Sequence, residues 1–434
     1  GFRGGERSFL TYLDANNLYG YAMRLKLGVG DYHWLGEEEV KGFDFMGVPD
    51  EGDDGYIIEC DLHYPPELHD DHNDYPLAPE HLTVTEDMLS PYALSFDGRL
   101  PRPTKKLVPN LMDKTKYVVH YRNLKFYVGH GLVVTKIHRV LAFKQEAWLK
   151  PYIDHCTMRR QAAKDTFHQD LYKYAANACF GKSMESVRKR INVRLIADPH
   201  KATKAVSKPT LQECRIINED LIMVRGDRQR IFLNKPISAG FAILELSKLL
   251  MYQFHYDYIK QTYGDRAKLL FTDTDSLTYH IKTDNLYDDM KNGLDWYDTS
   301  NFAPDHPLYS NANKKVVGKF KSETGSKAPK EFVGLRAKMY SLMVSSDEKP
   351  KCALKGIGRS YVKKHVTHER FVRTLETKVD INPAVFRTFR STNHTINTLQ
   401  VKKVCLSAWD DKRYILDDGV CSLAYGHRNI PKRV

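Results

Sequence analysis

The sequence lacks the features that mark secreted and membrane proteins. Its seven cysteines are an odd number, are scattered, and include no Cys-x-x-Cys pair. This pattern argues against a disulfide framework and against a zinc site, and it favours a reducing, intracellular compartment. No signal peptide is recognisable. The longest apolar run, from Ile237 to Phe254, is interrupted by Glu245 and Lys248, so we expect a buried helix there and no membrane span.

Internal repeats and low-complexity tracts are also lacking, so a solenoid or a disordered chain is not expected. The 434 residues suffice for two or three domain-sized units around a substantial core. The chain begins with Gly1 and Phe2 instead of Met. We therefore expect a fragment of a longer protein.

Charge is distributed very unevenly along the chain. Residues 36–90 contain seventeen Asp or Glu and a single Lys or Arg, Lys41, so this stretch carries −16. Because the whole chain is +12, the remainder carries +28, and residues 313–364 alone hold fourteen Lys or Arg against four acids. A positive field of this size is suited to a polyanion such as nucleic acid, although a solvated basic surface is an equally good interpretation of charge alone.

Three clusters combine residues in ways that suggest chemistry. The first, Asp14 to Gly20 (DANNLYG), follows an apolar strand; the second, Lys173 to Gly181 (KYAANACFG), has the pattern of a helix. The third, Phe271 to Ser276 (FTDTDS), lies between two alternating runs and predicts a β-hairpin with acids at its tip.

The acids of two clusters could together bind metal. Asp273 and Asp275 at one hairpin tip and Asp14 at another strand end could hold two divalent cations, which clamp the oxygens of a phosphoryl transfer when about 3.5–4 Å apart. Oxygen ligands favour Mg²⁺. By itself, however, Asp-x-Asp in a turn more often caps its own backbone.

The helical cluster supplies cations. Lys173 and Asn177 are four residues apart and share a face, and by the same spacing so do Arg160 and Lys164. Such a face could hold a triphosphate. For any one of these residues, a solvent-facing basic stripe is the simpler interpretation.

Taken together and in this order, the clusters resemble the three polymerase motifs of family B DNA polymerases, D-x-x-S-L-Y-P, K-x-x-x-N-S-x-Y-G and Y-x-D-T-D-S. The protein-primed branch, found in viruses, linear plasmids and Polinton-like mobile elements, is most similar. Lys338-Met339-Tyr340 resembles its K-x-Y primer-grip motif, and Phe2 to Gly5 (FRGG) resembles its Y-x-G-G element. The resemblance spans residues 2 to about 345.

The chain departs from the family motifs at a few positions, none of them a metal acid or the phosphate lysine. The replacements are Asn17 for Ser, Gly20 for Pro, Ala178 for Ser, Phe180 for Tyr and Phe271 for Tyr. Each keeps shape or backbone role and loses at most a hydroxyl or a rigid φ, so activity is still expected.

The resemblance implies an α+β right-hand fold with an antiparallel-sheet palm, helical fingers, a mixed thumb and two insertions. The segments expected are palm 1–35, acidic insertion 36–115, palm strands 116–150, fingers 151–190, second insertion 191–235, palm 236–344 and thumb 345–434.

The same resemblance implies a DNA-directed DNA polymerase using two Mg²⁺ ions, with Mn²⁺ as a substitute. Asp14 and Asp275 would bind both metals, and Asp273 would support them. The residues expected at the nucleotide are Leu18, Tyr19, Arg160, Lys164, Lys173, Asn177 and Phe180, with the Tyr19 ring excluding a 2′-hydroxyl. The residues expected at DNA are Lys338, Tyr340, Arg3, Gly4 and Gly5.

The expected partners are primer–template DNA, dNTPs and a terminal priming protein, without a membrane, and the expected state is a monomer. The place of action would be the nucleus or a viral or element replication site. The acidic 36–90 stretch is expected to face solvent or a basic priming protein. With only thirteen residues before Asp14, proofreading acids are not expected in this chain.

Two other functions remain open. An inactive, DNA-binding remnant of such a polymerase would have no reason to retain Asp14, Lys173, Asp273 and Asp275. A reverse transcriptase also places paired acids on a hairpin, but those acids are usually adjacent, whereas Thr274 separates them here.

Overall fold

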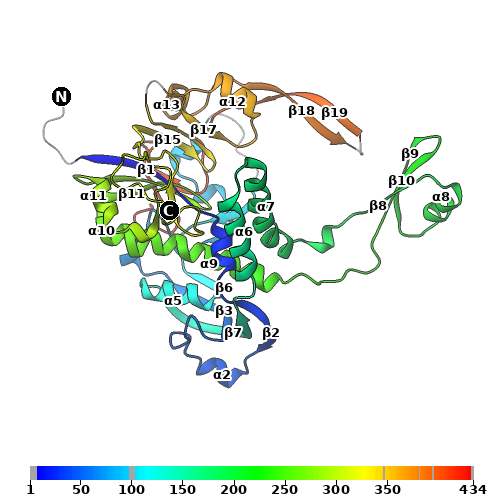
Figure 1. Cartoon of the computed structure of the whole chain (residues 1–434), viewed down its shortest axis with the longest axis horizontal. Helices are drawn as coiled ribbons and strands as arrows, with labels where there is room; N and C mark the ends of the chain where they lie inside the picture. The colour runs from blue at the N-terminus through cyan, green and yellow to red at the C-terminus, as the bar shows by residue number, and fades with distance from the viewer. Residues whose placement is uncertain (1–6, 97–102, 346–347, 381, 393–394, 432–434) are drawn as a thin grey trace.

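The computed structural model describes residues 7–96, 103–345, 348–380, 382–392 and 395–431. Helices and strands are mixed along the whole chain, as expected for an α+β fold (Figure 1). Among the described residues, no helix combines the length and the apolar character needed to cross a membrane.

A five-stranded sheet is the centre of the molecule. In the order β11-β12-β1-β14-β13, its strands are antiparallel except for the parallel pair β13 and β14. The strands are β1 (Ser8–Ala15), β11 (Ala267–Asp273), β12 (Ser276–Lys282), β13 (Tyr297–Asp298) and β14 (Phe320–Ser322). The predicted hairpin is therefore present as β11 and β12, and the first motif begins at the end of the strand beside it.

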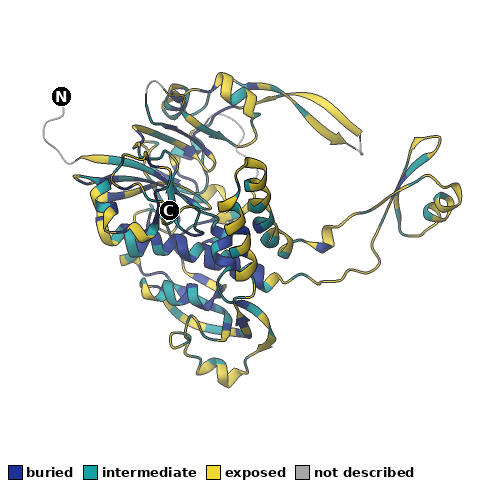
Figure 2. Ribbon diagram, viewed as in Figure 1, coloured by how far each residue is buried: buried dark blue, intermediate teal, exposed yellow. Residues whose placement is uncertain are grey.

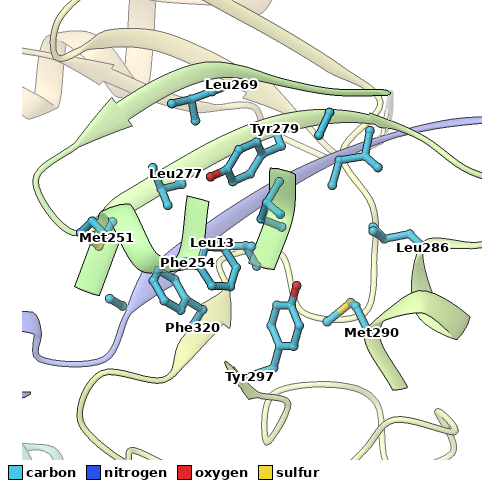
Figure 3. Close-up of a cluster of buried hydrophobic side chains, with 14 of the residues drawn as sticks. Leu13, Met251, Phe254, Leu269, Leu277, Tyr279, Leu286, Met290, Tyr297 and Phe320 are labelled. Carbon is cyan, nitrogen blue, oxygen red and sulfur yellow. The ribbon is translucent and has the colours of Figure 1, made fainter. Parts of the chain in front are cut away.

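One face of this sheet is covered by the helix predicted from the long apolar run. It comprises α9 (Ile237–Gln253), a π-helical continuation (Phe254–Lys260) and α10 (Gln261–Tyr263). Phe254 stacks on Phe320 with ring centroids 3.8 Å apart, and Leu13, Leu277 and Tyr279 pack around them (Figure 3). The short helix α11 (Leu286–Lys291) adds Leu286 and Met290 to this core.

The strands within 116–150 do not join that central sheet, contrary to our expectation. They form a second sheet in the order β2-β7-β3-β6, built from β2 (Leu27–Trp34), β3 (Asp54–His63), β6 (Lys114–His120) and β7 (Val133–Glu146). Moreover, α5 (Tyr121–Gly129) lies between β6 and β7, where strand was expected. Tyr121, Leu124 and Tyr127 recur at three-residue spacing and are buried on one helical face. Over a stretch this short, apolar residues at helical spacing are easily mistaken for the apolar–polar alternation of a strand, and strand was therefore expected here.

The acidic segment is part of this second sheet and is largely neutralised within the chain. Its strand β3 pairs with both β6 and β7. Many of its carboxylates form ion pairs with bases of other segments: Asp50 with Lys125, Asp53 with Lys26, Asp54 with Lys144, Glu59 with Arg139, Asp61 with His138, Asp70 with Arg428, Asp74 with Lys268 and Glu80 with Lys114. Most acids of 36–90 are nevertheless exposed, in keeping with the expectation that the stretch faces solvent, and the ion pairs reduce the charge that it presents there. The remaining elements of this segment are α2 (Glu37–Lys41), α3 (His69–His72), α4 (Pro91–Leu94), β4 (Glu80–Thr83), β5 (Lys105–Val108) and the 3-10 turns Pro66–Leu68 and Glu86–Met88.

The segment 151–190, expected to hold two helices, contains two long ones. They are α6 (Lys150–Ala162) and α7 (Thr166–Ser183), and the break between them ends at Asp165, whose side chain caps α7 by accepting from the His168 amide at 2.9 Å. Both pack with α1 (Leu18–Met23) and α9 in one apolar cluster. At Gly240 a Cβ atom would lie 2.2 Å from the Met184 sulfur, so glycine permits this close approach.

The second insertion stands away from the body on two extended segments (Figure 1). It contains a three-stranded sheet in the order β8-β10-β9 and one helix, and most of its residues are exposed (Figure 2). Its elements are β8 (Asn192–Ile196), α8 (Pro199–Val206), β9 (Leu211–Asn218) and β10 (Leu221–Gly226).

The region expected as one thumb, 345–434, is divided in the structure. Its first part combines β17 (Lys351–Leu354) with β15 (Glu331–Arg336) and β16 (Met339–Met343), followed by α12 (Arg359–His365), α13 (His368–Thr377) and the hairpin of β18 (Ala384–Thr392) and β19 (Thr395–Lys403). The tail, with β20 (Tyr414–Ile415) and β21 (Ser422–Leu423), returns to the acidic segment. There Arg413 donates to the Asn73 carbonyl at 2.8 Å, and the Leu111 amide donates to the Tyr425 carbonyl at 2.7 Å.

The stacked pair beneath the central sheet generates a stability prediction. Phe320 is 0% exposed, so Phe320→Ala leaves a cavity and is expected to lower the free energy of unfolding by about 3–5 kcal/mol. Phe389→Ala, at a side chain 78% exposed, should change it by less than about 0.5 kcal/mol. Denaturant unfolding followed by tryptophan fluorescence measures both. Equal effects of the two variants would contradict this packing.

Candidate functional site

Strand pairing brings together two acids that are far apart in the sequence, Asp14 and Asp275. Asp14 lies opposite Ser276 in the β1–β12 ladder, directly beside the hairpin turn. The Ala15 amide donates to the Asp275 carbonyl at 2.7 Å, and the Asp275 amide donates to the Asp273 carbonyl at 2.7 Å. Thr274 adopts φ 62° to close this turn. The backbone therefore holds Asp14 and Asp275 at adjacent strand ends.

The electrostatics of this pair favour a bound cation. Burial, together with the charges of Asp275 and Glu323, raises the pKa of Asp14 to about 7. Burial likewise raises the pKa of Asp275, to which the charge of Asp273 adds. Nearby carboxylates that repel each other in a partly desolvated site are stabilised in their ionised form by a divalent ion.

The ligand set suits Mg²⁺ with substrate as an additional ligand. No group of three His, Cys, Asp or Glu side chains that could hold an ion was found in the described part of the chain. Asp273 is engaged elsewhere, because its Oδ1 lies 2.6 Å from the Lys338 Nζ. Mg²⁺ commonly takes only one or two carboxylates together with water and substrate phosphates. Asp14 and Asp275 fit that mode of binding.

Glu323 is a further acid of the site that the sequence analysis did not identify. It follows β14 directly, and its amide donates to the Tyr12 carbonyl at 2.9 Å. Its charge raises the pKa of both Asp14 and Asp275, and its carboxylate pairs with Lys351. The only sequence signal for Glu323 was that it is an isolated acid, just after a short strand, in a strongly basic segment.

The K-x-Y motif lies against the acid hairpin. Lys338, at φ 61°, occupies the turn between β15 and β16 and forms the ion pair with Asp273. The hydroxyl of Tyr340 lies 2.8 Å from that of Tyr12, and its ring lies 4.8 Å from the ring of Phe271. Lys338 and Tyr340 are therefore placed at the same end of the central sheet as the acids.

Tyr19 and Phe180 join the first and second motifs. Their rings stack with centroids 4.4 Å apart and an interplanar angle of 20°. Burial raises the pKa of Tyr19, and the charge of Asp275 raises it further, so its hydroxyl lies within the field of the acids. Leu18, by contrast, is buried in the core beneath the sheet.

Two departures from the family motif compensate for each other in the first turn of α1. Asn17 adopts φ 43° and caps the helix by accepting from the Gly20 amide at 3.1 Å. A proline at position 20 could not donate this hydrogen bond, and a Cβ there would lie 2.3 Å from the Asn17 side chain. Asn17 and Gly20 therefore form a cap that replaces the rigid proline.

The residues of the 151–190 segment that were expected to contact the nucleotide differ in where they lie. Lys173 lies close enough for its charge to lower the pKa of Asp14. Arg160 Nε and Asn177 Oδ1 are buried without a protein partner among the described residues. Lys164, expected on one helical face with Arg160, lies instead in the exposed connection after α6 ends at Ala162, because Asp165 begins the next helix.

Three of the expected DNA-binding residues, Arg3, Gly4 and Gly5, lie outside the described residues. The structure therefore brings together Asp14, Asp273, Asp275, Tyr19, Phe180, Lys338 and Tyr340.

The raised pKa of Asp14 predicts how stability depends on pH. Without metal, the folded state holds the Asp14 proton up to about pH 7, whereas an unfolded aspartate loses it near pH 3.8, so stability falls as pH rises between these values. Asp14→Asn should therefore stabilise the metal-free protein at pH 8, on the order of 2 kcal/mol, and less at pH 5. Thermal unfolding with EDTA measures this, with Asp284→Asn as the exposed control. The same advantage at both pH values would contradict the shift.

Comparisons with known proteins identify the fold. No family model and no curated protein matches the sequence. Among solved structures, Phi29 DNA polymerase complexed with primer–template DNA matches with a TM-score of 0.51 and 15% identity over 93% of this chain and 59% of that chain. An orthorhombic crystal form of Phi29 DNA polymerase matches with a TM-score of 0.52 and 14% identity over 93% of this chain and 61% of that chain. The chain thus spans about three fifths of the length of these polymerases, and at this identity the likeness shows a shared α+β fold.

Proposed function

We propose that the chain is a DNA-directed DNA polymerase that adds deoxynucleotides to a primer 3′-hydroxyl with the help of two divalent metal ions. The observation that carries this proposal is the convergence of Asp14 and Asp275 beside Tyr19 and Lys338. The shared fold supports it, because two of the similar structures are Phi29 DNA polymerase with primer–template DNA, one of them with incoming nucleotide substrates as well.

In this proposal Asp14 and Asp275 hold the metal ions, Mg²⁺ or alternatively Mn²⁺. When bound, the ions lower the pKa of the attacking hydroxyl and neutralise charge on the triphosphate and the leaving pyrophosphate. The charge of Glu323 raises the pKa of both acids, and the charge of Asp273 raises the pKa of Asp275. The protein's contribution is to position the reactants and to balance their charge.

The remaining side chains orient the two substrates. Lys173 projects from the fingers and contacts the phosphates, and the stacked rings of Tyr19 and Phe180 form the floor beneath the sugar and base. Lys338 and Tyr340 hold the primer end, where a phosphate can compete with Asp273 for the lysine. The basic 313–364 segment then follows the duplex phosphates.

The finer assignment is protein-primed replication of a virus or mobile element, and it rests on the motif resemblance. A terminal protein would be the priming partner. Since many acids of 36–90 are already paired within the chain, a basic partner would have to compete with these internal ion pairs. Localisation at a nuclear or viral replication site and a monomeric state are part of the same proposal.

Primer extension tests the activity. Wild type should extend a labelled primer–template with Mg²⁺ and dNTPs, and Asp275→Ala should lower the rate by about 1,000-fold or more, because one metal carboxylate is lost. Asp284→Ala, at an exposed residue just after β12, is the matched control and should extend normally. If wild type and Asp275→Ala both bind the primer–template and neither extends it, the chain acts as a DNA-binding remnant or requires a further region, which a longer chain would restore.

Sugar selection tests the role of Tyr19. Tyr19→Val removes the ring stacked on Phe180, so incorporation of ribonucleotides relative to deoxynucleotides should rise by about 10- to 200-fold. Tyr32→Val, at an exposed tyrosine of β2, should leave the ratio unchanged. The measurement is single-nucleotide incorporation with matched dNTP and rNTP. An unchanged ratio in Tyr19→Val would exclude the ring from sugar selection.

A further inference from the structure

Asp298 is a buried carboxylate at the edge of the central sheet, in the same cross-strand row as Asp14 and separated from it by Lys321 of β14. It lies on β13 and is only 1% exposed, and both of its carboxylate oxygens accept hydrogen bonds. Its Oδ2 accepts from the Asn16 side chain at 2.7 Å and from the Lys315 amide at 2.9 Å, and its Oδ1 accepts from the Ser300 amide at 3.0 Å. Burial opposes its charge, but the bonds from Ser300, Asn16 and Lys315 outweigh burial and hold its pKa below the ordinary value.

Asn16 is thereby held at three points. Besides its side-chain bond to Asp298, its amide donates to the Lys319 carbonyl at 2.8 Å and its carbonyl accepts from the Gly318 amide at 2.7 Å. Asn16 lies between Asp14 and Tyr19 in the first motif. Any displacement of Asn16 is therefore transmitted to both the metal acid and the sugar-facing ring.

The loop that bonds Asp298 is also attached to the fingers. Gln161, at the end of α6, donates to the Lys314 carbonyl at 2.7 Å. The Lys315 ammonium donates to Gln169 of α7 at 3.3 Å, while the Lys315 amide donates to Asp298. The peptide between Lys314 and Lys315 is thus bonded to α6 through its carbonyl and to Asp298 through its amide, and the Lys315 side chain adds a bond to α7.

These contacts form one continuous hydrogen-bonded connection from the fingers to the first motif. It runs from Gln161 through the Lys314–Lys315 peptide to Asp298 and then to Asn16. The bonds at the buried Asp298 end favour a fixed arrangement, because releasing one partner there leaves a buried polar group unpaired.

We propose that Asp298 is a positioning residue that couples the fingers helices to the first acid motif, so that nucleotide binding on the fingers sets the placement of Asp14 and Tyr19. This inference rests on the proposed polymerase function and deepens it. Asp298 touches neither metal nor substrate; it acts through Asn16.

The first test replaces Asp298 with its isostere. Asp298→Asn keeps the shape of the side chain but replaces one carboxylate oxygen with an NH₂ group. That group cannot accept a hydrogen bond, so at least one of the bonds from Asn16, Lys315 and Ser300 is lost. For the folded, DNA-bound fraction, the KM for dNTP should rise about fivefold or more, and selection against ribonucleotides should weaken. A merely structural role would lower the active fraction and leave both quantities unchanged. Asp295→Asn, the same exchange at an exposed residue three positions earlier, is the control.

The second test cuts the connection at its exposed end, where folding is not at risk. Gln161→Ala removes the bond to the Lys314 carbonyl and should also raise the KM for dNTP, whereas Gln261→Ala, at an exposed glutamine of α10, should not. In the double variant Gln161→Ala/Asp298→Asn the two increases should not multiply, because both changes break one connection.

The outcomes separate the coupling from the polymerase function itself. If wild type extends primers while Asp298→Asn and Gln161→Ala keep the wild-type KM and sugar selection, or if their effects multiply, the coupling is overturned and the function stands. If wild type extends no primer under any condition, the proposed function fails and the coupling fails with it.

Discussion

The confinement of like charges at the end of the central sheet is the constraint on which the rest of the structure depends. Burial and the charges of neighbouring acids raise the pKa of Asp14 and of Asp275, so both carboxylates cost folding free energy when ionised. The backbone bonds of the hairpin turn and the pairing of β1 with β12 and β14 resist their separation. A rigid core is therefore needed directly beneath them, and the stacked Phe254 and Phe320 supply it.

The uneven charge along the chain is likewise balanced by contacts between residues that are distant in the sequence. The acidic segment 36–90 would repel a polyanion if its carboxylates were free, yet many of them are paired with Lys26 just before β2 and with bases of β6, β7, α5 and the C-terminal tail. These pairs remove much of the negative field from the surface and attach the segment to the body. The excess of Lys and Arg in 313–364 is then left to act on a ligand near the acid site.

Helices α6 and α7 are joined to the first motif and the central sheet by two kinds of contact, which differ in how much movement they allow. The stacked rings of Tyr19 and Phe180 are an apolar contact that tolerates small sliding movements. The hydrogen bonds through Lys315 and Asp298 are directional and tolerate little movement. The hydrogen bonds therefore tie the position of the first motif to that of the helices, whereas the stacked rings add an apolar contact that constrains it less.

The sequence by itself determined the local elements with strong periodicity or turn chemistry. These include the acid hairpin, the helix after Ile237 and the two helices within 151–190, because each depends on neighbouring residues. Only the tertiary structure decided which strands share a sheet, that α5 interrupts 116–150, that the tail returns to Asn73 and Leu111, and that Lys164 leaves the helix. It alone also revealed Glu323 and Asp298, since a single acid carries no local pattern. The physical reason is that pairing between strands and burial of single charges arise from contacts between distant residues, whereas periodicity reports only the residues of one element.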